Sequence, residues 1–252
     1  MKITLDARIS VQENAAVYYE KAKKIKRKIE GLEKAMEETK KEIDSSLKED
    51  LKKQKKIEKT RKEKKWFEKF HWFYTANGNL CIGGKDASQN DLIFKKYMED
   101  NDLFFHADIT GGSVVILKNG VNSSREEREE AAGFAASFSR AWKMKYASID
   151  VYSLKKEQLS KYSQGGFVGK GGIAMEGQRE WFRNTPLKLK IGLGDLGPEV
   201  LPYCSRKIIK NEKILIPGNE KKEKAAKKLS NLFKIHIDEI AQILPSGELK
   251  IS

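Results

Sequence analysis

The feature that most constrains the fold is a heptad pattern of apolar residues in the first part of the chain. Ser10 followed by Glu13 forms a capping-box pair, which predicts a helix that begins at residue 11. The steps between apolar or small residues then alternate between four and three, the a/d spacing of a coiled coil. A seam with this spacing is normally covered, so we expect a partner helix. The seam consists of Val11, Ala15, Tyr18, Ala22, Ile25, Ile29, Leu32, Met36, Thr39 and Ile43.

The seam weakens at residues 43–50, IDSSLKED. Asp44, Ser45 and Ser46 are residue types that turn a chain and cap a second helix. Residues 47–65 then form a charged arm with few apolar anchors. The sequence therefore predicts an N-terminal antiparallel helical hairpin, a coiled coil. The alternative is one continuous helix that dimerises.

The charge balance limits the classes of partner. The 252 residues include 50 Lys and Arg against 36 Asp and Glu, a formal net charge of +14. A field of this sign attracts phosphate polymers or anionic surfaces. No apolar run approaches the roughly 20 residues of a membrane span, and the N-terminus lacks the apolar core of a signal peptide. The two cysteines have no zinc spacing, so we expect reduced thiols in a cytoplasmic protein without metal or membrane contact.

From Trp66 onward the pattern changes to short strands and helices. Asn77-Gly78 between two apolar runs indicates a β-hairpin. One helix is expected from Ser88, with Asp91 as its capping partner, and another from Ser124 to about residue 143. The mixed order of these elements predicts an α+β fold, a mixed-sheet α/β sandwich. Further strands are expected around residues 103–109, 113–118, 147–154, 171–177 and 187–194, and further helices around 219–233 and 238–244.

The first candidate site is CIGGKDASQND, residues 81–91. Its two adjacent glycines allow close backbone approach, and Lys85 supplies a positive charge. Gln89 and Asn90 fall in the first turn of the expected helix, where backbone amides attract an anion. Asp86 and the absence of an earlier glycine argue against a Walker nucleotide loop. Two readings remain, a grip on a phosphate backbone and a simple strand-to-helix turn.

Two other stretches carry candidate residues. His106 and Asp108 alternate on one side of an expected strand, but the other two histidines lack ligand spacing and no nucleophile elbow is present. His106 is therefore either a structural hydrogen-bonding residue or an RNA contact. Lys170 between glycines and Arg179 beside Trp181 fit contacts to phosphate and base. The alternative for this second stretch is a glycine-rich β-hairpin.

Taken together, these blocks resemble a known family, the NFACT-R domain, which is the RNA-binding-type module of NFACT proteins. The blocks, in chain order, are KKWFEKFHWFYTANGNLCIGGKDASQNDLIFKKYM, DLFFHADITGGSVVILKN, EEAAGFAASFSRAW and GGFVGKGGIAMEGQREWF. Residues 3–20 resemble the family's entry into its coiled coil, and IPGNEKKEKAAKKL and DEIAQILPSGELKI resemble the tail of archaeal members. We therefore divide the chain into a linker and coiled-coil hairpin (1–65), an NFACT-R RNA-binding-type domain (66–195) and a C-terminal basic helical extension (196–252).

The resemblance also implies a function. NFACT proteins act in ribosome quality control: they bind the large ribosomal subunit carrying peptidyl-tRNA and support untemplated tailing of the stalled chain. Their coiled coil reaches towards the stalk base, and full-length members carry an N-terminal NFACT module. The resemblance thus implies a non-enzymatic RNA-binding module with ribosomal RNA and tRNA as partners and no cofactor. The signature positions that carry over are Lys85, Gln89, Asn90, His106 and Asp108.

One block departs from the family pattern. HADITGG stands where HADLHGA is more usual, so Thr110 replaces a second histidine and weakens any role for a histidine pair. A function of a different class also remains open. The chain would then be a protein-interaction adaptor acting through the coiled coil, with its charge serving only solubility.

Overall fold

The fold consists of a long helix and a unit built on two antiparallel sheets. The computed structural model describes residues 4–8, 10–58, 65–163, 166–169 and 171–252, without the side chains of residues 34, 41–58, 163 and 167. The chain divides into an N-terminal unit, residues 1–64, and a C-terminal unit, residues 65–252. Among the described helices, none combines the length and the apolar character needed to cross a bilayer.

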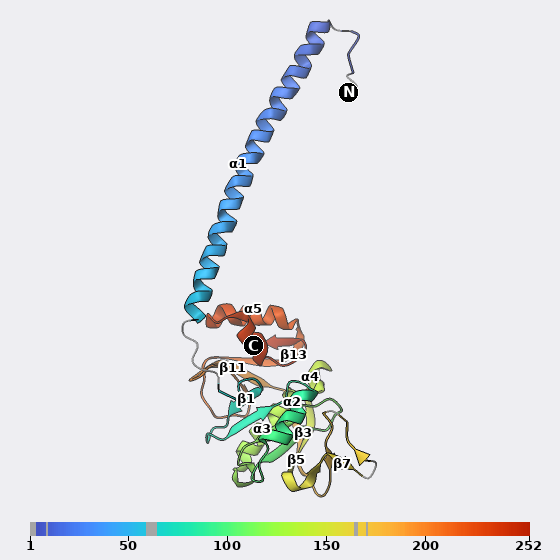
Figure 1. Ribbon diagram of the computed structural model, residues 1–252, viewed down its shortest axis with the longest axis vertical. Coiled ribbons are helices and arrows are strands. Elements are labelled where there is room, and N and C mark those ends of the chain that lie inside the picture. Colours follow the sequence, from blue (N-terminus) through green and yellow to red (C-terminus); the bar gives the residue numbers. More distant parts are fainter. Residues whose placement is uncertain (1–3, 9, 59–64, 164–165, 170) are drawn as a thin grey trace. The chain divides into compact units, whose positions relative to one another are not determined.

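The N-terminal unit contains α1, Val11–Glu58, one continuous helix of 48 residues (Figure 1). The predicted capping box is confirmed, because the Ser10 amide donates to Glu13 Oε2 at 2.7 Å and the Glu13 amide donates to Ser10 Oγ at 3.2 Å. The predicted helical hairpin is wrong, since α1 runs without interruption through residues 44–46. Asp and Ser each cost only about 0.7 kcal/mol or less inside a helix, and neither Gly nor Pro stands there to break it.

The apolar seam of α1 is exposed over its described part. The side chains of Val11, Ile25, Leu32 and Met36 are 80%, 57%, 64% and 73% exposed. At the start of the helix the preceding segment folds back, and the Tyr18 hydroxyl donates to the Thr4 carbonyl at 2.6 Å. The described residues therefore leave the predicted heptad face of α1 uncovered.

The C-terminal unit is organised around a six-stranded sheet with the order β1-β2-β4-β3-β5-β10. Its paired strands are antiparallel, as are those of the second sheet, so the predicted mixed sheet is wrong and the α+β class is confirmed. The predicted hairpin at Asn77-Gly78 is also confirmed, with Gly78 at a φ of 91°. The strands are β1 His71–Tyr74, β2 Leu80–Gly83, β3 Leu103–Ala107, β4 Val115–Leu117, β5 Ser148–Lys155 and β10 Glu180–Pro186.

Both faces of this sheet are covered by helices. Phe105 points to the face packed by α3, Arg125–Ser137, while the adjacent Phe104 points to the face that packs Ile93. The second face is covered by α2, Ala87–Leu92, and by the π-helical turn Ile93–Tyr97. Strand alternation thus divides the apolar side chains into two cores, one on each side of the sheet.

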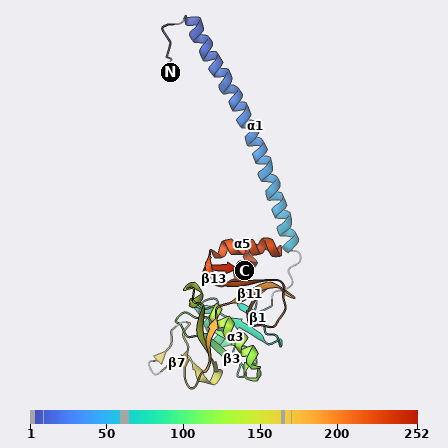
Figure 2. The same ribbon diagram turned by 180° about the vertical axis from the view of Figure 1, so that it is seen from behind.

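A four-stranded sheet with the order β12-β11-β13-β14 completes the C-terminal unit. It shares the α3-side core, and the last two helices, α5 and α6, pack against it; α5 lies beside β13 in both ribbon views (Figures 1 and 2). The predicted boundary at residue 195 falls in the turn between β11 and β12. The elements are β11 Leu189–Gly194, β12 Gly197–Pro202, β13 Lys210–Glu220, α5 Lys222–Phe233, α6 Ile237–Ile243 and β14 Leu249–Ile251.

Two predicted helices differ in detail from the structure. The helix expected from Ser88 begins at Ala87, and Asp86 rather than Ser88 caps it by accepting from the Gln89 amide at 2.9 Å. The helix expected from Ser124 to residue 143 is capped by Ser124 but is broken after α3. Ser139 caps a separate turn, α4 Arg140–Lys143, by accepting from the Ala141 amide at 3.2 Å. This break redirects α4 relative to α3.

A projecting segment follows β5. It contains a 3-10 turn at Lys156–Gln158 and two short ladders, one joining β6 Leu159–Ser160 to β9 Ala174–Met175 and the other joining β7 Tyr162–Ser163 to β8 Gly166–Phe167. A second 3-10 turn, Gly120–Asn122, lies between β4 and α3. The segment from Leu159 to Met175 is called the flap below.

Candidate nucleic-acid interface

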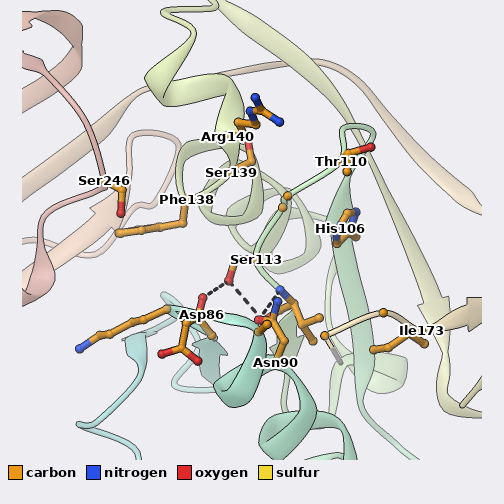
Figure 3. Close-up of a pocket in the computed structure, with 18 of the residues that line it drawn as sticks. Asp86, Asn90, His106, Thr110, Ser113, Phe138, Ser139, Arg140, Ile173 and Ser246 are labelled. Carbon is orange, nitrogen blue, oxygen red and sulfur yellow. Dashed lines mark hydrogen bonds between the residues drawn. The ribbon is translucent and has the colours of Figure 1, made fainter. Parts of the chain in front are cut away.

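One hollow of the C-terminal unit, here called the main cleft, has a volume of about 880 Å³. Its walls come from four places far apart in the sequence: the turn after β2, the end of β3 with the following loop, α4, and the flap (Figure 3). Ser139 and Arg140 lie on one side of it, and Asp86 and Asn90 lie on the other. The cleft is therefore a tertiary feature that no single motif could form.

The glycine turn after β2 is held in place by hydrogen bonds to the chain that leads into β4. The Gly84 amide donates to the Val114 carbonyl at 3.0 Å, and Ser113 Oγ donates to the Gly84 carbonyl at 2.7 Å. A Cβ on Gly84 would lie 2.1 Å from Asn90 Oδ1, so only glycine fits. Asn90 Oδ1 in turn accepts from the Val114 amide at 3.1 Å, and Asn90 is only 9% exposed. This network ties the turn to β4 and fixes the cleft wall.

Three backbone amides of the turn, those of Lys85, Gln89 and Asn90, are occupied by the protein itself. The Lys85 amide donates to Gln89 Oε1 at 3.1 Å, and the Asn90 amide donates to the Asp86 carbonyl at 2.9 Å. The side-chain amide of Gln89 also donates to the Lys69 carbonyl at 3.3 Å. The sequence-based idea that these amides receive an anion thus has little support in the geometry. An anion at this turn would meet the Lys85 side chain instead.

His106 lies at the end of β3 on the cleft wall. Its Nδ1 is 3.3 Å from the Tyr152 hydroxyl, and a Cβ on Gly112 would come within 2.8 Å of its Nε2. Burial lowers the pKa of His106 below its usual value, while hydrogen bonds with the backbone and the nearby Asp108 carboxylate oppose this shift. The imidazole is therefore neutral at pH 7 and can both donate and accept.

The predicted site residues lie in different positions with respect to the main cleft. Lys85, Asn90 and His106 line it. Gln89 and Asp108 are not among its lining residues, and the guanidinium carbon of Arg179 lies 4.5 Å from the centroid of the Tyr152 ring, whose hydroxyl contacts His106. Lys170 lies outside the described residues. Contact of any of these residues with RNA stays a prediction.

The charges around the cleft include two that sequence reasoning missed. Arg140 and Lys143 are exposed and line the cleft together with Lys85, and Thr110 lines it as well. Of the described lining residues, only Asp86 is acidic. Arg140 and Lys143 were missed because the sequence was interpreted as one long helix that includes them. Ser139, a residue type that caps helices, was the signal for a separate turn. The cleft therefore carries an excess of positive charge.

The rim formed by the flap is fixed by a nearly buried ion pair. Lys161 Nζ lies 2.5 Å from Asp91 Oδ1 and 2.5 Å from the Gly172 carbonyl, and the Gly171 amide donates to the same Asp91 oxygen at 3.1 Å. The hydrogen bond from Lys161 is the main reason that the pKa of Asp91 is lowered. Asp91 thus anchors the flap instead of capping α2.

The described residues show no arrangement for metal chemistry. Nowhere among them do three or more His, Cys, Asp or Glu side chains gather as a metal ion would require. The cleft instead combines cations, glycine turns and aromatic or apolar side chains such as Phe104 and Phe138. This combination suits a phosphate-bearing polymer.

Comparison with known proteins agrees with this chemistry. Residues 69–177 match the family described as the NFACT protein RNA binding domain. The matched segment contains Lys85, Asn90, His106 and Arg140 of the main cleft. The C-terminal unit is thus built around an RNA-binding domain of the NFACT-R type.

Full-length relatives extend this result. The chain is 41% identical over 203 residues to the archaeal Rqc2 homolog aRqcH of Methanocaldococcus jannaschii, over 77% of this chain and 30% of that protein. It is 32% identical over 198 residues to the ribosome quality control complex subunit NEMF homolog of Drosophila melanogaster, over 76% of this chain and 20% of that protein. The chain belongs to the Rqc2/NEMF family of ribosome quality control proteins, and it spans less than a third of the length of these two relatives.

A solved structure is also similar. It is described as the C-terminal of the fibronectin/fibrinogen-binding protein from Streptococcus suis, and it has 25% sequence identity and a TM-score of 0.41. The similarity covers 70% of this chain and 77% of that one.

Proposed function

We propose that the C-terminal unit binds RNA through the main cleft, with the side chains of Lys85, Arg140 and Lys143 neutralising backbone phosphates. The observation that carries this proposal is the gathering of these three cations, from two separate elements, in a hollow of about 880 Å³ whose described lining contains one acidic residue. The family description as an RNA binding domain supports the ligand class. Ribosomal RNA and tRNA are the proposed ligands.

The biological role follows from the relatives. Because the names of several relatives refer to ribosome quality control, we propose that the full-length protein acts in this process in the cytoplasm. It would bind the large ribosomal subunit carrying peptidyl-tRNA and support untemplated tailing of the stalled chain. In this role the domain positions RNA and catalyses no reaction. The coiled-coil region would reach towards the stalk base, and an N-terminal NFACT module would complete the protein.

The salt dependence of RNA affinity tests the proposal. Each phosphate contact contributes a log–log slope of roughly −0.7 to −0.9, so one contact accounts for about a threefold loss of affinity between 50 and 200 mM salt. Fluorescence anisotropy with labelled tRNA should show binding at low salt and a steep loss of affinity over this range. Lys85→Ala should reduce the size of the slope by about one.

The matched control is Lys227→Ala, which removes the same charge from an exposed position on α5. It should leave the slope almost unchanged. Absence of tRNA binding by the unmodified chain at low salt would refute the proposal. If Lys85→Ala and Lys227→Ala change the salt slope equally, the main cleft is not the RNA-binding site.

A second candidate function rests on α1. Its seam exposes Val11, Ile25, Leu32 and Met36, so protein contacts through this helix would make the chain an interaction adaptor. The proposed partner is protein at the ribosomal stalk base. Binding to intact ribosomes, but not to ribosomes stripped of stalk-base protein, would favour this function. Equal binding to both would contradict it.

A further inference from the structure

A second hollow, here called the Trp181 pocket, lies at the free edge of the six-stranded sheet. It has a volume of about 250 Å³ and shares no lining residue with the main cleft. Its walls are α3, the edge strand β10 and the chain on either side of the β11–β12 hairpin. Of its lining residues, only Trp181 was connected with RNA from the sequence, as an aromatic side chain beside Arg179 that fits contact with a base.

The pocket is built by a bulge and by small residues. The pairing of β10 with β5 shifts register between Phe182 and Thr185, and Asn184 adopts a φ of 51°. Asp150 holds the bulge, because Arg183 Nη1 lies 2.6 Å from its Oδ2 and the Asn184 amide donates to its Oδ1 at 2.8 Å. Opposite the bulge, Ala132 and Gly133 of α3 leave the floor open. The hollow is thus a fixed part of the fold.

The described lining combines three aromatic side chains, those of Trp181, Phe182 and Tyr203, with three cations and the single carboxylate of Glu129. The guanidinium carbon of Arg183 lies 4.0 Å from the centroid of the Trp181 ring, and Lys188 Nζ lies 3.5 Å from the centroid of the Tyr203 ring. Tyr203 is 45% exposed. Stacking surfaces next to cations are the arrangement with which proteins hold single-stranded nucleic acid.

We propose that the Trp181 pocket binds one unpaired nucleotide of single-stranded RNA. The base would stack on Tyr203 in place of the Lys188 ammonium. Lys188 would then pair with the adjoining phosphate, next to the guanidinium of Arg183, which stays paired with Asp150. The volume is below the roughly 300–1,000 Å³ of pockets for drug-sized ligands, so it suits one ring system and not an extended group. A base within a duplex is already stacked and paired, so only an unpaired base can enter. This inference rests on the proposed function insofar as the ligand is RNA.

Two RNA probes, one single-stranded and one double-stranded, test the proposal on the full chain. Fluorescence anisotropy is measured with a labelled oligouridine and with an RNA duplex of the same length. Loss of one base–aromatic stack weakens binding by about 5- to 160-fold. Tyr203→Ala should show a loss in this range with oligouridine and less than about a twofold change with the duplex. Tyr203→Phe keeps the ring and should restore the affinity for oligouridine.

Further variants separate the possible outcomes. Lys188→Ala should weaken oligouridine binding more than the control Lys227→Ala, and thermal melting verifies that each variant is folded. If Lys85→Ala weakens binding of both probes while Tyr203→Ala weakens neither, the pocket proposal fails and the main cleft stands. Equal losses with both probes on Tyr203→Ala also contradict the pocket proposal. Absence of oligouridine binding to the unmodified chain overturns the pocket proposal, whereas the main-cleft proposal is overturned by absence of tRNA binding.

Discussion

Replacement of Asn90 tests whether this residue acts through the fold or through direct contact with RNA. Its Oδ1 accepts a 3.1 Å hydrogen bond from the Val114 amide, at a position only 9% exposed. Asn90→Ala leaves that amide buried without a partner, which costs about 1–3 kcal/mol of unfolding free energy. For a unit of this size each kcal/mol lowers Tm by about 2–4 °C, so we expect a fall of roughly 2–12 °C.

The assay is thermal melting combined with hydrogen exchange at the Val114 amide. The amide should exchange faster in Asn90→Ala, because its acceptor is gone. Gln89→Ala is the matched control. Its side chain also bonds to the backbone of the turn but is partly accessible to water, so its loss should cost about 0.5–1.5 kcal/mol. A variant Asn90→Ala with the Tm and the Val114 exchange rate of the unmodified chain would refute the structural role.

Three further predictions concern α1, Cys204 and His71. In a chain whose native cysteines are replaced, spin labels at positions 36 and 54 should lie roughly 27 Å apart along a continuous α1; a separation near 10 Å would instead restore the hairpin. Although Cys204 as a residue is exposed, desolvation of its sulfur, followed by the charge of Glu130, raises the pKa of this thiol to about 11 from 9.0. Its alkylation at pH 8 should therefore be about 100-fold slower than that of a model thiol, and a model-like rate would contradict this. Burial, followed by the charges of Lys85 and Lys222, lowers the pKa of His71 well below 6.5, so the unfolded state binds the extra proton and stability should fall as pH drops below about 6.5. His71→Phe should flatten that dependence in urea unfolding, and an unchanged pH profile would refute it.

Features set by neighbouring residues could be read from the sequence. The capping box of Ser10 and Glu13 and the turn at Gly78 depend on contacts within a few residues. The prediction of a helical hairpin at residues 44–46 was wrong because it, too, relied only on local residue types. Asp and Ser favour caps locally, but they stop a helix only when the following segment finds something to pack against. Residues 44–46 therefore remain inside α1.

The candidate site was only partly predictable. Lys85 and His106 could be selected because they lie in unusual short motifs, but their joining with Arg140 depends on the break between α3 and α4 and on the packing of distant loops. The sequence correctly placed Gln89 and Asn90 at the turn that follows the two glycines. Their hydrogen bonds to backbone groups are visible only in three dimensions. The Trp181 pocket depends on a bulge in β10, which strand patterns do not show.

The central claim is that RNA binds in the main cleft, and RNA affinity of two matched double variants tests it most directly. Lys85→Glu with Arg140→Glu reverses two cleft charges, while Lys224→Glu with Lys227→Glu reverses two exposed charges on α5. Both variants have the same net charge, so non-specific attraction changes equally. At 50 mM salt the cleft variant should bind labelled tRNA at least about tenfold more weakly than the α5 variant. Equal affinities of the two variants would contradict the account.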